Sequence, residues 1–178
     1  MSIGLFSFAR AGLAPLVSAI FPIPKIALLP LFVIWFGIGE GSKVATILFG
    51  TFFPTVIATY GGVDNVDRNL IRMGQSFGLS WSSIVRKIIL PGALPAILSG
   101  FRISASIAIV LLVAAEMISG DFGLGYMIMD SYMVNKYVSM VMAMISLGFV
   151  GWATSAMVRW AGNRMMQWRV KALALQGR

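Results

Sequence analysis

Four long apolar stretches limit what this chain can fold into. They cover residues 23–39, 44–60, 93–117 and 138–160, and polar segments separate them. Each is close in length to the ~20 residues that an α-helix needs to cross the hydrocarbon core of a bilayer. Hydrophobic residues make up 58% of the 178 positions, against about 45–50% in soluble domains. We therefore predict an all-α protein, a single bundle over residues 1–178 with about four transmembrane helices.

Prolines and glycines divide the apolar stretches. Pro30 predicts a kink in the first helix, because proline is tolerated in a membrane helix where neighbouring groups satisfy the freed backbone. The polar residues 39–43 predict a tight turn between the first two helices. Residues 119–137 are glycine-rich at first and then aromatic and Met-rich, and we interpret them as an interfacial loop.

The segment over residues 61–91 is too polar for hydrocarbon. Apolar side chains recur in it every three or four positions, which predicts an amphipathic helix too short to span a membrane. These side chains are Val66, Leu70, Met73 and Phe77. We expect Asp64 or Asn65 to cap the start of this helix, and Gly78 to end it in a left-handed turn.

A second short helix is predicted directly after Gly78. Ser80 is suited to cap its first turn, and Pro91 is expected to end it because proline has no amide hydrogen to donate. The sequence therefore predicts a helix–glycine–helix element outside the membrane.

Basic residues indicate the orientation of the chain. The chain holds 14 Lys and Arg against 6 acidic residues. With four spans, ten of the basic residues fall on one side: Arg10, Arg68, Arg72, Arg86, Lys87, Arg159, Arg164, Arg169, Lys171 and Arg178. Lys43 and Lys136 fall on the other side. Because cytoplasmic loops collect Lys and Arg, residues 61–91 and the C-terminus are predicted to be cytoplasmic. The basic residues form no aromatic-interleaved face, so nucleic acid is not an expected partner.

Several kinds of chemistry are not expected. The chain has no cysteine and no histidine, which removes disulfides, Cys/His metal sites and the usual general base. Residues 37–43 lack the spacing of a phosphate-binding loop. Asp121 has no second aspartate inside a facing span, as an intramembrane aspartyl protease would need. We predict no catalytic residue, no metal and no cofactor, and the chain is not expected to be an enzyme.

Residues 72–91 carry a spaced motif, RMGQSFGLSWSSIVRKIILP. It has a triplet, three further residues, a glycine, nine further residues, and then Ile-x-Leu-Pro. This pattern resembles the EAA signature of bacterial ATP-binding-cassette (ABC) importer permeases. Arg72, Met73 and Gly74 stand at the triplet and Gly78 at the glycine. Ile88, Leu90 and Pro91 form the end of the motif.

The flanking sequences, residues 22–43 and 90–118, resemble the branch of this family that imports sulfonates, taurine and nitrate. The resemblance implies a multi-pass permease of the bacterial inner membrane that forms the translocation path for a small anionic solute. The implied partners are an ABC ATPase, a periplasmic or lipoprotein solute-binding protein and a second permease subunit, in the simplest case a copy of the same chain.

The resemblance also implies that the 61–91 element contains a coupling helix, which would sit in a groove of the ATPase. The residues implied in this contact are Arg72, Met73, Gly74, Phe77, Gly78, Leu79, Ser80, Ile88, Leu90 and Pro91. Arg72 stands where the family usually has Glu, a charge reversal that could weaken or re-specify docking. The alternative is an amphipathic helix that only lies on the membrane surface.

Arg102 and Glu116 are the charges most clearly inside a predicted span. Each nominally costs about 2.5–3.5 kcal/mol at the centre of a membrane helix. They are fourteen positions apart, or about 21 Å along a helix, so they cannot pair with each other. Two interpretations stay open for each residue, a structural tie to a neighbouring group and a role in gating or along the path.

Family members carry two further spans before the position that matches the start of this chain. The resemblance therefore implies a permease that lacks its N-terminal part. The alternative function is a non-transporting membrane remnant, which inserts without building a pathway.

Overall fold

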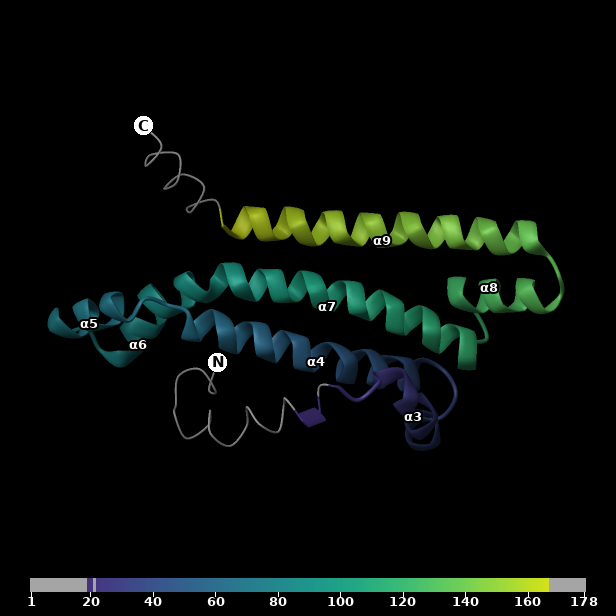
Figure 1. The fold of residues 1–178 in the computed structure, drawn as a ribbon, viewed down its shortest axis with the longest axis horizontal. Coiled ribbons are helices and arrows are strands. Elements are labelled where there is room, and N and C mark those ends of the chain that lie inside the picture. Colours follow the sequence, from purple (N-terminus) through teal and green to yellow (C-terminus); the bar gives the residue numbers. More distant parts are fainter. Residues whose placement is uncertain (1–18, 21, 167–178) are drawn as a thin grey trace. The chain divides into compact units, whose positions relative to one another are not determined.

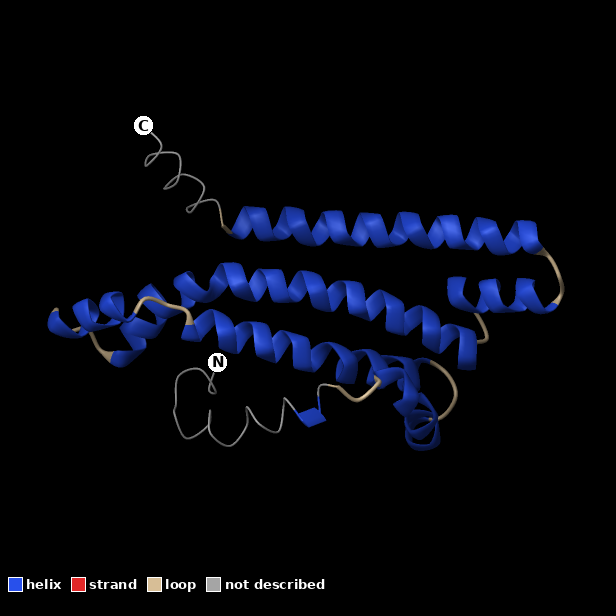
Figure 2. Cartoon of the chain, in the orientation of Figure 1, coloured by secondary structure: helices blue, strands red, loops and turns tan. Residues whose placement is uncertain are grey.

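The computed structural model describes residues 19–20 and 22–166. Within these residues it contains helices, turns and loops but no strand (Figure 2). The all-α fold class is confirmed. The described residues form two compact units, one with residues 19–20, 54–101 and 159–166 and the other with 22–53 and 102–158. The part of the predicted basic tail after residue 166 lies outside the described residues.

Among residues 19–20 and 22–166, three helical segments are long and apolar enough to cross a membrane. They are α4 (Glu40–Asp64), the continuous run Trp81–Ser119, and α9 (Tyr137–Met165) (Figure 1). The shortest has 25 residues, which at 1.5 Å per residue is about 38 Å. This exceeds the ~30 Å of a bilayer core, so the last three predicted spans are present as spanning-length helices.

The first predicted span is shorter than expected. Residues 23–39 contain a 3₁₀ turn, η1 (Lys25–Leu28), followed by α3 (Leu29–Phe36). Together these twelve residues reach about 18 Å at the α-helical rise. Pro30 lies in the first turn of α3, where amides have no hydrogen-bond acceptor inside the helix, so the lack of an amide hydrogen costs nothing. It therefore stands at the start of the helix and does not kink it.

The predicted turn at residues 39–43 begins two residues earlier. Gly37 and Gly39 have φ values of 78° and 130°, which favour glycine because it has no Cβ. Glu40 already belongs to α4, and Lys43 lies in the first turn of that helix. The interfacial loop predicted at residues 119–137 likewise contains a ten-residue helix, α8 (Leu124–Met133).

Pro91 does not end a helix, and this prediction is wrong. The short helix α6 (Trp81–Ile84) continues through a π-helical turn, η2 (Val85–Ile89), into α7 (Leu90–Ser119). The amide of Leu90 donates to the carbonyl of Val85, five residues back. A proline ring clashes with the carbonyl four residues earlier in a regular helix, and a wider turn before Pro91 is one way for a helix to accommodate it.

The unit with residues 54–101 has its own hydrophobic core. Five buried residues form it: Val63, Val66, Ile84, Ile89 and Ala93. The helices α4 and α7 approach closely beside this core, because a Cβ on Gly62 would lie 2.9 Å from the Cβ of Ala96. A Cβ on Gly100 would overlap that of Ala58. Glycines at these two points allow the two helices to pack with their backbones near each other.

This close packing predicts different outcomes for two glycine substitutions. Gly61→Ala adds a methyl group where nothing lies within 4 Å, whereas Gly100→Ala adds one against Ala58. Both gain up to about 1 kcal/mol of helix propensity. We expect Gly100→Ala to lower the melting temperature and Gly61→Ala to keep or raise it, measured by tryptophan fluorescence in lipid nanodiscs. Equal melting temperatures for both variants would contradict the close α4–α7 approach.

Candidate functional site

The helix α5 (Arg68–Ser76) begins the helix–glycine–helix element. Its N-cap is Asp67, whose Oδ1 accepts a hydrogen bond of 2.8 Å from the amide of Asn69. The prediction of Asp64 or Asn65 as the cap is wrong because α4 extends to Asp64. Three residues, 65–67, thus separate the long apolar helix from the short polar one.

Gly78 reverses the chain between α5 and α6, as predicted. Its φ is 71°, in the left-handed region that residues with a Cβ avoid. The amide of Leu79 donates to the carbonyl of Gly74 at 3.1 Å, and the amide of Gly78 donates to Gln75 at 2.9 Å. These bonds satisfy the last carbonyls of α5, as at other helix ends with a left-handed glycine. A Cβ at Gly78 would meet nothing within 4 Å, so the backbone angle is what requires glycine here.

Ser80 stands at the N-cap position of α6, as predicted. Its hydroxyl does not bond a backbone amide of the helix but donates to the Oγ of Ser83 at 3.0 Å. The carbonyl of Ser80 accepts from the amide of Ile84 at 3.0 Å and starts the helix. Ser80 is exposed, so its own hydrogen-bonding groups remain accessible to a partner.

One face of α5 packs against α6 and η2. Gly74 is buried on this face, and a Cβ there would lie 2.9 Å from Cδ1 of Ile88 and 3.3 Å from Cγ1 of Ile84. Ile71, Leu79 and Ile88 pack against the core of the unit. The short helix is therefore held to the rest of its unit by small and apolar residues, with no room for a larger side chain at Gly74.

A second face of α5, beside the packed one, is apolar and exposed. Leu70, Met73, Phe77 and Trp81 have relative exposures of 48%, 54%, 79% and 45%, and we call these four residues the exposed apolar face. Of the predicted apolar stripe, only Val66 is buried. Leu70 and Trp81 were not among the residues predicted for the contact. The i, i+3 and i+7 spacing of Leu70, Met73 and Phe77 was a sequence signal for Leu70.

The predicted coupling residues lie together in one unit but divide by exposure. Arg72, Met73, Phe77, Gly78, Ser80 and Leu90 are exposed. Gly74 is buried, and Leu79, Ile88 and Pro91 are half-buried. Only the first group is available to a partner, while the second group holds the element in shape.

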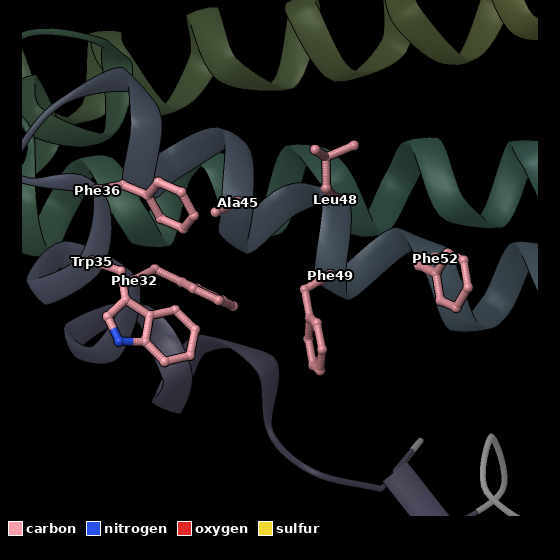
Figure 3. A pocket seen from close by; sticks show the side chains of 7 residues that line it. All are labelled: Phe32, Trp35, Phe36, Ala45, Leu48, Phe49 and Phe52. Atoms are coloured by element: carbon pink, nitrogen blue, oxygen red, sulfur yellow. The ribbon is translucent and has the colours of Figure 1, made fainter.

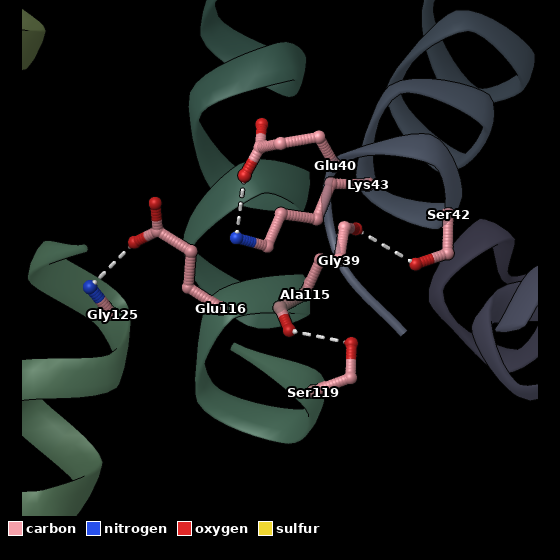
Figure 4. Close-up of polar contacts among 8 residues, drawn as sticks. All are labelled: Gly39, Glu40, Ser42, Lys43, Ala115, Glu116, Ser119 and Gly125. Atoms are coloured by element: carbon pink, nitrogen blue, oxygen red, sulfur yellow. Dashed lines mark hydrogen bonds and ion pairs between the residues drawn. The ribbon is translucent and has the colours of Figure 1, made fainter. Parts of the chain in front are cut away.

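Arg102 and Glu116 lie on α7 within the other unit. Arg102 is exposed, and Glu116 is half-buried. The carboxylate of Glu116 accepts a hydrogen bond of 2.7 Å from the amide of Gly125 at the start of α8 (Figure 4). This hydrogen bond agrees with the first of the two interpretations for Glu116, a structural tie to a neighbouring group.

Lys43 is a buried charge that the sequence analysis did not select. Its side chain is 2% exposed, and its ammonium lies 2.9 Å from Oε1 of Glu40, whose side chain is 66% exposed. The ammonium also lies 4.5 Å from the ring centroid of Phe122, within the range of a cation–π interaction. The only feature of the sequence that pointed to a buried Lys43 was its position directly before the apolar stretch 44–60.

An apolar groove lies between α3 and α4 (Figure 3). Its volume is about 330 Å³. Its lining is Phe32, Trp35, Phe36, Ala45, Leu48, Phe49 and Phe52. None of these side chains carries a charge, so the groove offers shape and apolar surface but no group to select an ion. Within the described part of the chain, no cluster of three or more Asp, Glu, His or Cys residues could hold a metal ion.

Comparison with known proteins assigns the chain to a family of transport proteins. The model of the family described as "Binding-protein-dependent transport system inner membrane component" matches residues 1–167. The putative aliphatic sulfonates transport permease SsuC of Bacillus subtilis is 37% identical over 157 residues, which cover 88% of this chain and 57% of that protein.

Two further relatives have similar names. The taurine transport system permease TauC of Escherichia coli is 42% identical over 131 residues, 74% of this chain and 48% of that protein. A putative ABC transporter permease of Methanocaldococcus jannaschii is 37% identical over 155 residues, 86% of this chain and 58% of that protein. The chain spans about half the length of these relatives. It belongs to the family of binding-protein-dependent transport system inner membrane components.

Proposed function

We propose that this chain acts as the permease subunit of an ABC importer and couples to a cytoplasmic ATPase through the exposed apolar face of α5 and α6. The observation that carries this proposal is the position of four large apolar side chains on the outside of a polar element. A patch of this kind is uncommon on a surface that meets only water. Membership of the transport family supports a protein partner on this face.

The contact would combine an apolar centre with basic neighbours. Arg72 is exposed on the same helix as Leu70 and Met73, and no ion pair of Arg72 is found within the described residues. Such charges at the edge of an interface set specificity and association rate more than affinity. Arg72 is thus expected to select the ATPase and the apolar face to bind it.

The proposed solute is a small anion of the sulfonate class, or a similar one such as nitrate. The names of the relatives from Bacillus subtilis and Escherichia coli specify aliphatic sulfonates and taurine. A solute-binding protein would deliver the solute, and a second permease subunit, in the simplest case another copy of this chain, would complete the path. The chain itself would carry out no covalent chemistry.

ATP hydrolysis in proteoliposomes tests this function. The chain is reconstituted with its cognate ATPase and solute-binding protein, and taurine or an alkanesulfonate is added. A parallel chimera carries the unmatched region of the Bacillus subtilis relative, because the match covers only 57% of that protein. Hydrolysis that the loaded binding protein stimulates supports a permease. If only the chimera shows stimulated hydrolysis, the chain is better described as a non-transporting remnant. If neither the chain nor the chimera assembles with the ATPase, the proposed coupling is overturned.

The turn at Gly78 generates a specific prediction for coupling. Gly78→Pro cannot adopt a φ of 71°, since proline fixes φ near −65°, and we expect it to abolish the stimulated hydrolysis. Gly78→Asn is the matched control, because asparagine tolerates the left-handed region and no atom lies within 4 Å of its Cβ position.

Gly78→Ala should give a stimulated hydrolysis between those of the Pro and Asn variants. Alanine in the left-handed conformation is strained by about 1–2 kcal/mol, which corresponds to a roughly 5- to 30-fold change in a folded population. Equal hydrolysis by the Pro and Asn variants would show that the turn is not needed for coupling.

The proposed orientation can be tested with single cysteines, because the chain has none of its own. Ser76 at the end of α5 and Lys136 after α8 are both exposed. We expect a membrane-impermeant maleimide to label Ser76→Cys only in inverted vesicles and Lys136→Cys only in intact spheroplasts. The reverse pattern would place α5 outside the cell and remove it from any cytoplasmic partner.

A further inference from the structure

The corner between α7 and α8 is built around one carboxylate. Glu116 lies in the last turn of α7, and its Oε2 accepts the 2.7 Å hydrogen bond from the amide of Gly125 (Figure 4). Gly125 is the second residue of α8, whose first amides have no partner inside the helix. A carboxylate at this end of a helix is also favoured by the helix dipole. Glu116 therefore links the end of one helix to the start of the next.

Three glycines make the space that Glu116 occupies. A Cβ on Gly123 would overlap the carboxyl group of Glu116, and one on Gly125 would overlap the carbonyl oxygen of Val113 and lie 2.8 Å from Cβ of Glu116. A Cβ on Gly120 would lie 2.9 Å from Cα of Glu116. Gly123 also has a φ of 117°. The connection can close around the glutamate only because these three positions lack side chains.

The same connection contacts a second charged residue, Lys43, which is buried. Phe122 places its ring 4.5 Å from the ammonium of Lys43 on α4, and this ammonium holds the 2.9 Å ion pair with Glu40. Residues 120–125 thus meet Glu116 through their glycines and Lys43 through an aromatic ring. Buried charges are costly in an apolar chain and are usually retained for function.

The helix α8 depends on these contacts for its position. It has only ten residues, three of them buried: Gly125, Ile128 and Ser131. Isolated helices of this length are marginal in water, and few of its side chains are buried within the unit, since Tyr126, Met127, Tyr132 and Met133 are exposed. The hydrogen bond that the Gly125 amide donates to Glu116 therefore ties the first turn of α8 to the end of α7.

We propose that Glu116 is a positioning residue for transport, which holds α8 at one end of the solute path through the clasp of Gly120, Gly123 and Gly125. This inference rests on the proposed function, since it assigns α8 to the path of an importer. Loss of the clasp would let α8 move and would let ATP be hydrolysed without solute import. Docking of the ATPase, which uses a different unit of the chain, would persist.

A distance measurement tests the clasp without any transport. Spin labels are placed on α7 and α8 at Val110→Cys and Tyr132→Cys, which are 67% and 59% exposed and lie in the same unit. We expect a narrow distance distribution in the otherwise unchanged full chain and a broad one with Glu116→Ala. Glu116→Gln keeps a carbonyl oxygen that can accept from Gly125, so its distribution should stay narrow.

Glycine variants separate the clasp from a general loss of fold. Gly123→Ala is expected to broaden the distribution as Glu116→Ala does, because its methyl group would overlap the carboxylate and because alanine rarely adopts a φ of 117°. Gly148→Ala on α9 is the control, since nothing lies within 4 Å of its Cβ position. A narrow distribution in both Glu116→Ala and Gly123→Ala would overturn the proposal.

A transport measurement tests the functional part of the inference. In the reconstituted complex we expect Glu116→Ala to lower the solute imported per ATP hydrolysed about tenfold, while ATPase assembly and hydrolysis stay near the wild-type level. A merely structural role would lower assembly, hydrolysis and import together, and this result would overturn the positioning role. If the wild-type complex imports nothing, the proposed function fails, whereas the spin-label distances still decide whether Glu116 holds α8.

Discussion

A residue inside the hydrocarbon core of a bilayer finds no water for its amide and carbonyl groups. The chain must pair these groups within itself, and in a single segment only a helix does so completely. This constraint accounts for α4, the run Trp81–Ser119 and α9, each longer than the hydrocarbon core is thick. The π-helical turn before Pro91 lets the helix continue from α6 into α7 without a break.

The same constraint restricts polar residues to a few sites. In the unit with residues 54–101, the charged and polar positions gather on α5 and its flanks, and a core of its own supports this element. The helix faces its core with Ile71 and Gly74 and leaves Leu70, Met73 and Phe77 outward. If these three large apolar side chains served the packing of α5 within its own unit, they would be buried. Their exposure is the physical basis for proposing a partner. In the other unit, Lys43 and Glu116 are satisfied by Glu40, Phe122 and Gly125.

Hydropathy and glycine spacing predicted the spanning helices and the turn at Gly78, because both depend on local chemistry that a sequence displays directly. The errors occur where a local preference is overridden by its surroundings. Pro91 ends a helix by propensity, but the preceding π-turn accommodates it. Asp64 has a good capping side chain, but α4 continues through it and leaves that role to Asp67. The clasp around Glu116 joins residues through three-dimensional packing at glycines, and no periodicity in the sequence indicates it.

The proposed contact between the exposed apolar face and the ATPase can be tested with a photo-crosslinking amino acid in place of Phe77. Phe77 is 79% exposed, and Val138 on α9 is 76% exposed and serves as the control position. We expect the crosslinker at position 77 to capture the co-expressed ATPase and the crosslinker at position 138 not to capture it. Capture of lipid alone at position 77, or equal capture of the ATPase at both positions, would contradict the proposed contact.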